Sequence, residues 1–218
     1  MDRPAEIQNV DIKAFLRTAY DLQDADLLER LSAVAQLRGF GAHQLIADVG
    51  SPNRELMVIV AGTVRVFFVD YEGVPFTDCF LSQPGYPINT PQLDKQLECG
   101  LEAANAVTLL CIPADWLLSE LEHNVMLLKL QLKMMDWAVY FHWREKTNRC
   151  RLSALQRYLL FRREYPDLDG QISSKYIAEY IGVAPESLSR LRRELRKEKP
   201  VHKPVPEELL LRKKPWED

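Results

Sequence analysis

A stretch near the C-terminal end, SKYIAEYIGVAPESLSRLRREL at residues 174–195, constrains the fold more than any other part of the chain. Ala178 and Gly182 lie four residues apart: a side chain larger than Ala would hold two helices apart, and Gly permits the positive φ that ends a helix. Pro185 suits the first turn of a following helix, where a missing N–H costs nothing, and Ser173 is a suitable cap for the preceding one. The spacing therefore predicts two short helices joined by a tight turn. The apolar residues expected to fill the angle between them are Ile177, Ile181, Val183, Leu188 and Leu191.

The second helix of this pair keeps a polar outer face. Its polar residues are Glu186, Ser187, Ser189, Arg190 and Arg193. Glu186 and Arg190 are four residues apart, so both can enter one major groove, where Arg typically reads guanine and Glu reads cytosine. Ser174 and Lys175, at the start of the first helix, complete the predicted DNA-contacting set. The alternative is an ordinary helical hairpin whose Arg-rich face is merely solvated.

The charge of the chain is unevenly distributed along its length. Residues 1–143 contain 10 basic and 19 acidic residues, net −9, whereas residues 144–200 contain 14 basic and 8 acidic residues, net +6. The last 18 residues balance at 4 and 4, which accounts for the overall charge of −3. Basic charge gathered around the helix pair is typical of a sensor domain joined to a module that contacts DNA phosphates.

Composition and cysteine use indicate an ordinary soluble protein. No run of about 18 apolar residues exists, and the N-terminus lacks the order of a signal peptide, so we expect a cytoplasmic protein without membrane contact. The cysteines, scattered without metal-site spacing, are Cys79, Cys99, Cys111 and Cys150. They are interpreted as small apolar fillers, with a redox or metal-sensing role as the alternative. The histidines are isolated too, and no metal site is predicted from His43, His123, His142 or His202.

The chain before the helix pair divides into three parts. A helical segment is expected at 11–37, and from about Gly39 to Pro113 short β-rich runs alternate with Gly and Pro. Two strands are predicted within 56–69 on either side of Ala61-Gly62, with a turn at 70–73. Frequent turns without intervening helices predict an antiparallel barrel or jelly roll.

From Pro113 onward the pattern is helical. A short helix is predicted at 114–122, a long one capped by Asn124 and running to about Asn148, and a further one at 151–165. The long helix has an apolar stripe with strict 4-3 spacing: Leu121, Val125, Leu128, Leu132, Met135, Val139 and His142. This spacing favours a homodimer seam; the alternative is that the stripe packs on the chain's own β domain. The tail at 200–218 is expected to be loosely held or to form a poor wing.

The predicted fold class is α+β, with an N-terminal antiparallel β-roll like a cupin jelly roll or a cyclic-nucleotide-binding domain. A long dimerisation helix and a C-terminal helix-turn-helix domain of winged-helix type follow. The predicted domains are the sensor at 1–122, the dimerisation helix at 123–148, and the DNA-binding domain with its tail at 149–218.

This order of elements resembles the Crp/Fnr superfamily of bacterial transcription regulators, named after the cyclic-AMP receptor protein and the fumarate–nitrate regulator. The resemblance is sharpest in LSALQRYLLFRREYP followed by YIAEYIGVAPESLSRLRREL, which is similar to the family pattern IA-x-YLGI-x-P-E-(S/T)-LSR-(I/L)-RR. In the β segment, GAHQLIADVG, ELMVIVAGTVRVF and the PG at 84–85 are similar to the landmarks G-x-x-I-x-x-x-G, I-x-x-G-x-V-x-V and PG-(D).

The resemblance implies roles for particular residues. Glu186 and Arg190 would read bases, and Pro185 replaces a second family arginine, so the half-site should differ from that of the cyclic-AMP receptor. The tentative effector pocket comprises Gly85, Asn89, Thr90, Leu97, Glu98 and Cys99. Asn89 and Thr90 replace the family's Gly-Glu pair, and Leu97 and Glu98 replace its Arg-Ser pair. Because both key charges are lost, cyclic AMP is not expected to bind, and no cofactor is predicted.

The function that these features favour is a dimeric DNA-binding regulator that reads an inverted repeat in duplex DNA through the 185–198 helix. Its partners would be DNA, a second copy of itself, RNA polymerase and an unidentified small-molecule effector. One alternative is a cupin-like enzyme or ligand-binding protein with a helical tail, although the β segment contains only His43, too few ligands for a two-histidine metal site. Another is a constitutive DNA binder whose β domain is a scaffold.

Overall fold

The computed structural model describes residues 10–89, 93 and 95–197, and within them the strands form two antiparallel sheets. The strand order is β1-β7-β3 in one sheet and β2-β6-β4-β5 in the other. The strands are β1 (Gln36–Phe40), β2 (Leu45–Ala47), β3 (Glu55–Ala61), β4 (Val64–Val69), β5 (Pro75–Leu81), β6 (Gly100–Ala103) and β7 (Val107–Pro113). The predicted α+β class with an antiparallel β-roll is confirmed, although the β segment begins at Gln36 rather than near Gly39.

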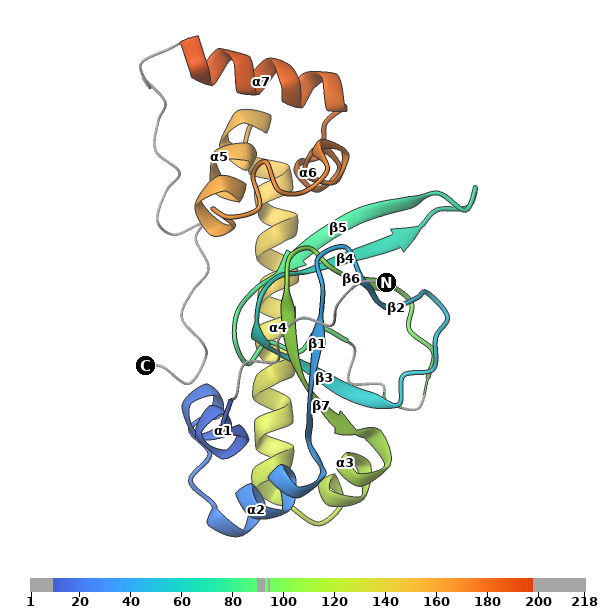
Figure 1. Cartoon of the computed structure of the whole chain (residues 1–218), viewed down its shortest axis with the longest axis vertical. Coiled ribbons are helices and arrows are strands. Elements are labelled where there is room, and N and C mark those ends of the chain that lie inside the picture. The colour runs from blue at the N-terminus through green and yellow to red at the C-terminus, as the bar shows by residue number, and fades with distance from the viewer. Residues whose placement is uncertain (1–9, 90–92, 94, 198–218) are drawn as a thin grey trace.

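Both predicted turns around β4 are present. Gly62, between β3 and β4, has φ +90°, and a Cβ atom there would lie 2.2 Å from the carbonyl oxygen of Ala106, so only glycine fits. In the turn after β4, the Asp70 carboxylate accepts hydrogen bonds from the backbone N–H groups of Glu72 and Val74, each at 2.9 Å. These local interactions fold β4 and β5 into a hairpin that extends outward from the roll in Figure 1.

The N-terminal helical segment is two helices rather than one. They are α1 (Ile12–Tyr20) and α2 (Ala25–Val34), capped by Asp11 and Asp24. Asp21 ends α1 in the left-handed conformation with φ 52°, which breaks the helix before Asp24 starts the next. The expectation of helix up to Leu37 is therefore wrong, because Leu37 belongs to β1, where its backbone pairs with Leu110.

The remaining helices are α3 (Ala114–Leu121), α4 (Val125–Arg151), α5 (Ala154–Glu164), α6 (Ser174–Ile181) and α7 (Pro185–Lys197). Figure 1 shows α4 running the length of the molecule, with α1, α2 and α3 at one end and α5, α6 and α7 at the other. The predicted cap of α4 is confirmed, because Asn124 Oδ1 accepts from the Leu127 N–H at 3.0 Å. α4 continues three residues past Asn148, and α5 begins only at Ala154, behind a capping box formed by Ser153 and Gln156.

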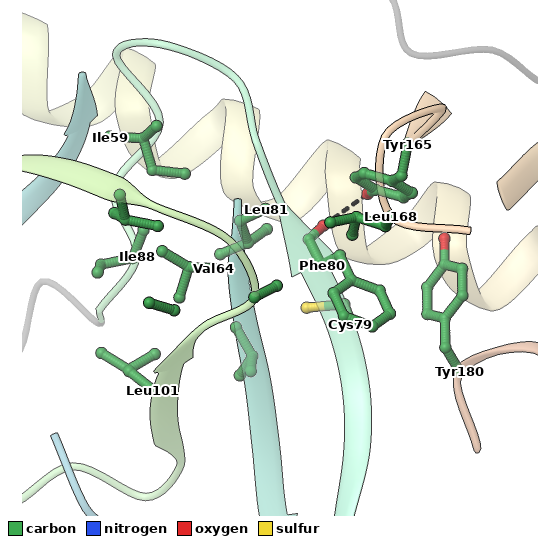
Figure 2. Close-up of a cluster of buried hydrophobic side chains, with 14 of the residues drawn as sticks. Ile59, Val64, Cys79, Phe80, Leu81, Ile88, Leu101, Tyr165, Leu168 and Tyr180 are labelled. Carbon is green, nitrogen blue, oxygen red and sulfur yellow. Dashed lines mark hydrogen bonds between the residues drawn. The ribbon is translucent and has the colours of Figure 1, made fainter. Parts of the chain in front are cut away.

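The larger of the two apolar clusters extends from the sheets into the C-terminal helices. Phe80 of β5 lies between rings from α5, α6 and the loop that follows α5: its centroid is 5.7 Å from Phe161, 5.7 Å from Tyr165 and 5.4 Å from Tyr180. The Tyr165 hydroxyl donates to the Phe80 carbonyl oxygen at 2.6 Å, drawn as a dashed line in Figure 2. The C-terminal helices therefore pack directly against the β-roll.

The second cluster joins α1, α2 and α3 to the outer side of β3 and β7 and to the first half of α4. Within the larger cluster, Tyr86 contacts α4 through Trp137 and Phe141, with centroid distances of 4.7 and 5.5 Å. None of the helices in the described part of the chain combines the length and apolar character needed to cross a membrane.

Candidate nucleic-acid interface and effector cavity

The turn between α6 and α7 has the geometry that its sequence predicts. Ser173 caps α6 by accepting from the Lys175 N–H at 3.2 Å, and Gly182 ends it with φ 68°. The N–H of Val183 donates to the Ala178 carbonyl at 2.9 Å, which closes the helix end, and Pro185 is the first residue of α7. These contacts hold the two helices in the predicted helix-turn-helix.

The apolar residues predicted to fill the angle between the helices do so. Ile177, Ala178 and Leu188 have no exposed surface, and Ile181 is buried beside them. Val183 and Leu191 are half-buried against the same cluster. A side chain larger than Ala at 178 would have no room here, which is why the spacing of small residues was informative.

The outer face of α7 is open to solvent. Glu186, Ser189, Arg190 and Arg193 are exposed, and Ser187 is half-buried. Arg190 contacts its own helix, where its Nη2 donates to Ser187 Oγ at 3.0 Å. In Figure 1, α7 lies across the far end of the molecule, with α5 and α6 between it and the β-roll. This face is thus solvent-accessible in the part of the chain that the structure describes.

A different arginine of α7, Arg192, is structural. It donates to Ser174 Oγ at 2.6 Å, to Asp169 Oδ1 at 2.7 Å and to the Tyr158 hydroxyl at 3.1 Å. Ser174 is exposed but already holds Arg192, and Lys175 forms a 3.8 Å ion pair with Glu179 one turn later. Ser174 and Lys175, both predicted to contact DNA, therefore already have partners within the protein.

Sequence reasoning missed Arg157, whose guanidinium joins the ends of two helices. It donates to the carbonyl oxygens of Ile181 and Leu152, both at 2.6 Å, and to that of Arg149 at 3.2 Å. These carbonyls lie at the C-terminal ends of α6 and α4, where unpaired acceptors favour a cation. Burial, with Arg149 nearby, lowers the pKa of Arg157. Nothing in the sequence distinguished Arg157 from the other polar residues of α5, which are Gln156, Arg162, Arg163 and Glu164.

A buried polar network joins the helix-turn-helix to the β-roll. Arg65 of β4 is 3% exposed; its Nε donates to Thr77 Oγ1 at 2.8 Å, and its Nη1 to Glu102 at 3.1 Å. Its guanidinium also stacks 3.6 Å from the ring centre of Tyr176 on α6. Glu179 of α6 completes the network by accepting from the N–H and the hydroxyl of Thr77, at 2.8 and 2.7 Å. The orientation of α6 is thus tied to the β4–β5 hairpin.

The apolar stripe of α4 lies on the surface of this single chain. Val125 is 65% and Leu132 57% exposed, and Leu128, Met135 and Val139 are exposed as well. Leu121, in contrast, is not on α4: it is the last residue of α3 and is half-buried against the second cluster, so its inclusion in the stripe of the long helix is wrong. His142 is exposed with its ring against Phe141. Trp143, which the 4-3 pattern did not include, is 72% exposed on the same helix. A contiguous apolar surface of this kind commonly marks an interface.

A cavity of about 340 Å³ lies between α4 and the β-roll. Its walls include Val58, Val66 and Leu81 from the strands and Met134 and Ala138 from α4. α1 and α2 contribute further apolar residues at one end, and the seam residues Met135, Val139 and His142 contribute to the wall formed by α4. The cavity therefore borders both clusters and the apolar stripe.

The cysteines divide by environment. Cys79 and Cys111 are buried, Cys99 is half-buried and Cys150 is exposed, so the filler interpretation is wrong for Cys150, which lies on the surface of α4. Burial raises the pKa of Cys79 and Cys99, and raises that of Cys111 to about 12. No group of three or more His, Cys, Asp or Glu side chains in the described ranges is placed to hold a metal ion.

No protein-family model and no curated protein matches this sequence, but its fold matches solved structures. FixK2 of Bradyrhizobium japonicum is 18% identical with a TM-score of 0.63, over 75% of this chain and 85% of that one. The cyclic-di-GMP-responsive global regulator CLP of Xanthomonas campestris is 14% identical with a TM-score of 0.64, over 83% and 95%. A protein of Eubacterium rectale assigned to the Crp/Fnr family of transcriptional regulators is 15% identical with a TM-score of 0.65, over 84% and 88%. The chain has the Crp/Fnr fold.

Within this Crp/Fnr fold, the residues predicted for the effector pocket are mostly committed to structure. The Gly85 N–H donates to the Ile59 carbonyl and its carbonyl accepts from the Tyr20 hydroxyl, both at 2.8 Å. Asn89 Oδ1 accepts from the Met57 N–H at 3.0 Å, and its amide donates to Asn53 and to the Glu55 carbonyl at 2.5 and 2.6 Å.

The later residues of the predicted pocket also differ from one another in their surroundings. Leu97 is buried and bonds through its backbone to Gly50 and Ser51, whereas Glu98 is exposed. Of the predicted pocket residues, Asn89 and Cys99 line the cavity, and Gly85, Leu97 and Glu98 do not. Thr90 lies outside the described residues, as do His202 and the predicted wing at 200–218.

Proposed function

We propose that this protein is a DNA-binding transcription regulator of the Crp/Fnr type that acts in the cytoplasm as a homodimer on an inverted-repeat operator. The observation that carries the proposal is the solvent-facing side of α7, on which Glu186, Arg190 and Arg193 are exposed beyond a correctly closed helix-turn-helix. The shared Crp/Fnr fold supports the same conclusion.

In this proposal α7 enters the major groove. Arg190 and Glu186 lie one turn apart, so their side chains can reach the edges of neighbouring base pairs, where Arg bonds guanine and Glu accepts from cytosine. Lys175 and Arg193 supply charge to the phosphates, which adds affinity without reading sequence. Arg192 does not contribute to base reading, because Ser174, Asp169 and Tyr158 hold it inside the domain.

The apolar stripe of α4 supports the homodimer. Exposed Val125, Leu128, Leu132, Met135 and Val139 recur at 4-3 spacing, as expected for a helix that packs along a copy of itself. A two-fold pair would place two α7 helices on one face of the duplex, about 34 Å apart, one helical turn of DNA. Two half-sites read together would provide the affinity that one helix-turn-helix seldom reaches.

Selection of bound duplexes from a random library, followed by fluorescence anisotropy on the selected operator, tests the proposal. Arg190→Ala should weaken operator binding by about 5- to 150-fold, the equivalent of about 1–3 kcal/mol for one base-reading arginine. Arg17→Ala, on exposed α1 far from α7, is the matched control and should leave affinity unchanged. Failure to enrich any duplex, or unchanged binding by Arg190→Ala, would overturn the assignment.

The dimer is tested separately. Leu132→Glu places a charge in the middle of the seam and should convert the protein to monomers in sedimentation velocity, with a parallel loss of operator binding. Lys133→Glu, at the neighbouring exposed position, is the control and should remain dimeric. If the Leu132→Glu protein were still dimeric, the proposal that α4 forms the dimer interface would be wrong.

Cyclic AMP is not the effector in this proposal. The described residues that line the cavity include no Lys or Arg, so the phosphate of a cyclic nucleotide would meet no cation there. Titration with labelled cyclic AMP should show no saturable binding at micromolar concentrations. RNA polymerase enters as a partner if the regulator activates transcription, and DNase footprinting with added polymerase on the selected operator tests that step.

A further inference from the structure

The 340 Å³ cavity has the size of a small-molecule site and opens at the exposed side of α4. Its volume lies at the lower end of the range usual for such sites, about 300–1,000 Å³. It extends along α4 from Val66 and Cys79 of the roll toward Leu16 of α1 and Leu127 at the start of α4.

Two of the polar groups that line this cavity, the Asp78 carboxylate and the Asn89 amide, are already paired. The carboxylate of Asp78 lies 3.2 Å from Arg149, which also binds the Asp78 carbonyl. The Asn89 amide is used by Met57, Asn53 and Glu55. Burial raises the pKa of Cys79 and Cys99, so both thiols stay neutral at physiological pH. An anion would therefore find neither Lys nor Arg among the described lining residues.

A polar side chain remains available in the wall. Gln131 of α4 is half-buried and lines the cavity, and no hydrogen bond joins its side chain to another described residue. An amide can donate and accept, so it would bind a hydroxyl, carbonyl or ester oxygen in an otherwise hydrocarbon ligand. Leaving such a group unpaired beside a purely apolar ligand would be unfavourable.

We infer that the cavity binds an uncharged, mainly hydrocarbon molecule with a hydrogen-bonding oxygen, and that this class of ligand is the effector of the proposed regulator. The effector role rests on the proposed function, whereas the binding site does not. Met135, Val139 and His142 belong both to the cavity wall and to the predicted seam. A bound ligand would therefore touch the side chains that a partner helix packs against, which couples occupancy to dimer geometry.

Two probes of equal length separate charge from hydrophobicity: 1-octanol and octanoate. Binding is measured by displacement of the neutral dye N-phenyl-1-naphthylamine from the full-length protein at pH 7.5. We expect saturable displacement by 1-octanol at about one site per protomer and at least about tenfold weaker displacement by octanoate, since burying an unpaired carboxylate is costly. No saturable displacement, or equal binding of the two probes, would overturn the inference.

Variants locate the site. Ala138→Phe fills the cavity and should abolish displacement, whereas Ala33→Phe, on the exposed face of α2, should not. Val58→Ala enlarges the cavity and should shift preference from 1-octanol toward 1-decanol, which provides a test should Ala138→Phe fail to fold. If 1-octanol still bound to Ala138→Phe but not to Leu132→Glu, it would be binding to the exposed stripe of α4, and the assignment of the cavity as the binding site would be wrong.

Operator affinity measured on the same samples distinguishes the two proposals. A protein that binds its operator but not 1-octanol refutes the cavity inference alone. A protein that binds 1-octanol at this site but selects no DNA refutes the regulator proposal and leaves the ligand site standing. If both hold, 1-octanol should change operator affinity in the wild-type protein and not in Ala138→Phe.

Discussion

Replacement of Arg65 by Met tests the polar network that joins the β-roll to α6. Met preserves most of the apolar stem and removes the charge and every hydrogen bond of the guanidinium. In the wild-type protein Arg65 is 3% exposed, bonds Thr77 and Glu102, and lies 4.0 Å from Glu179. It also covers the Tyr176 ring.

The expected loss of stability depends on the carboxylates that stay buried once Arg65 is replaced. Breaking a buried ion pair by removing one partner costs about 3–5 kcal/mol, because the other charge remains desolvated. Glu102 and Glu179 retain 15% and 18% exposure of their side chains, and Glu179 keeps both bonds to Thr77, so the lower end applies. We expect Arg65→Met to lower the free energy of unfolding by about 3 kcal/mol and the melting temperature by about 6–12 °C.

Urea unfolding followed by circular dichroism measures the loss, and Arg54→Met, at an exposed position just before β3, is the matched control with an expected change within about 0.5 kcal/mol. Adding Glu179→Gln to Arg65→Met should recover about 1 kcal/mol, since it removes the stranded charge. Hydrogen exchange should accelerate in α6 before it does in β7. A loss below about 1 kcal/mol, or strictly additive single-variant effects, would refute the reasoning.

Further predictions concern glycines in three turns and a buried thiol. Gly62→Ala should cost roughly 3 kcal/mol or more in urea unfolding, because its Cβ would meet backbone at 2.2 Å, whereas Gly73→Ala, with φ +82° and open space around it, should cost about 1 kcal/mol. Gly182→Ala should also cost about 1 kcal/mol, since only its φ of 68° opposes a side chain, and Gly182→Asn should recover part of this loss. Burial raises the pKa of Cys111 to about 12, so its stabilising contribution is complete below about pH 8.5, the ordinary value in the unfolded chain, and declines as pH rises toward 12. Cys111→Ala should flatten this part of the unfolding profile, and Cys150→Ala, at an exposed position, should not.

The same unfolding measurements can contradict each of these predictions. Equal stability of Gly62→Ala and Gly73→Ala would mean that the β3–β4 turn relaxes around a side chain. If Gly182→Asn unfolded at a lower urea concentration than Gly182→Ala, the positive φ of residue 182 would not be the reason for the lost stability. An unfolding free energy that rises between pH 9 and about 11 in the wild-type protein alone would contradict the sign assigned to Cys111.

Local signals in the sequence were sufficient to predict several helix ends and the helix-turn-helix formed by α6 and α7. Asn124, Ser173, Gly182 and Pro185 act through hydrogen bonds and backbone angles within their own turn, so their roles could be predicted without knowing the rest of the fold. The break between α1 and α2 also depends on a single residue, Asp21 in the left-handed conformation, but the sequence pattern predicted one continuous helix there.

Long-range contacts could not be predicted in this way. Arg65 and Glu179 are far apart in sequence, and only the packing of β5 against α6 places both on Thr77. The cavity likewise depends on how α4 lies over the roll, which is why three of the five described residues assigned to the pocket by motif spacing do not line it. Sequence alone determined the helix-turn-helix, because its geometry is set within a few turns of chain. The tertiary structure decided which arginines of α7 are exposed and which polar groups beside the cavity are already paired, because burial and pairing depend on residues brought together only by folding.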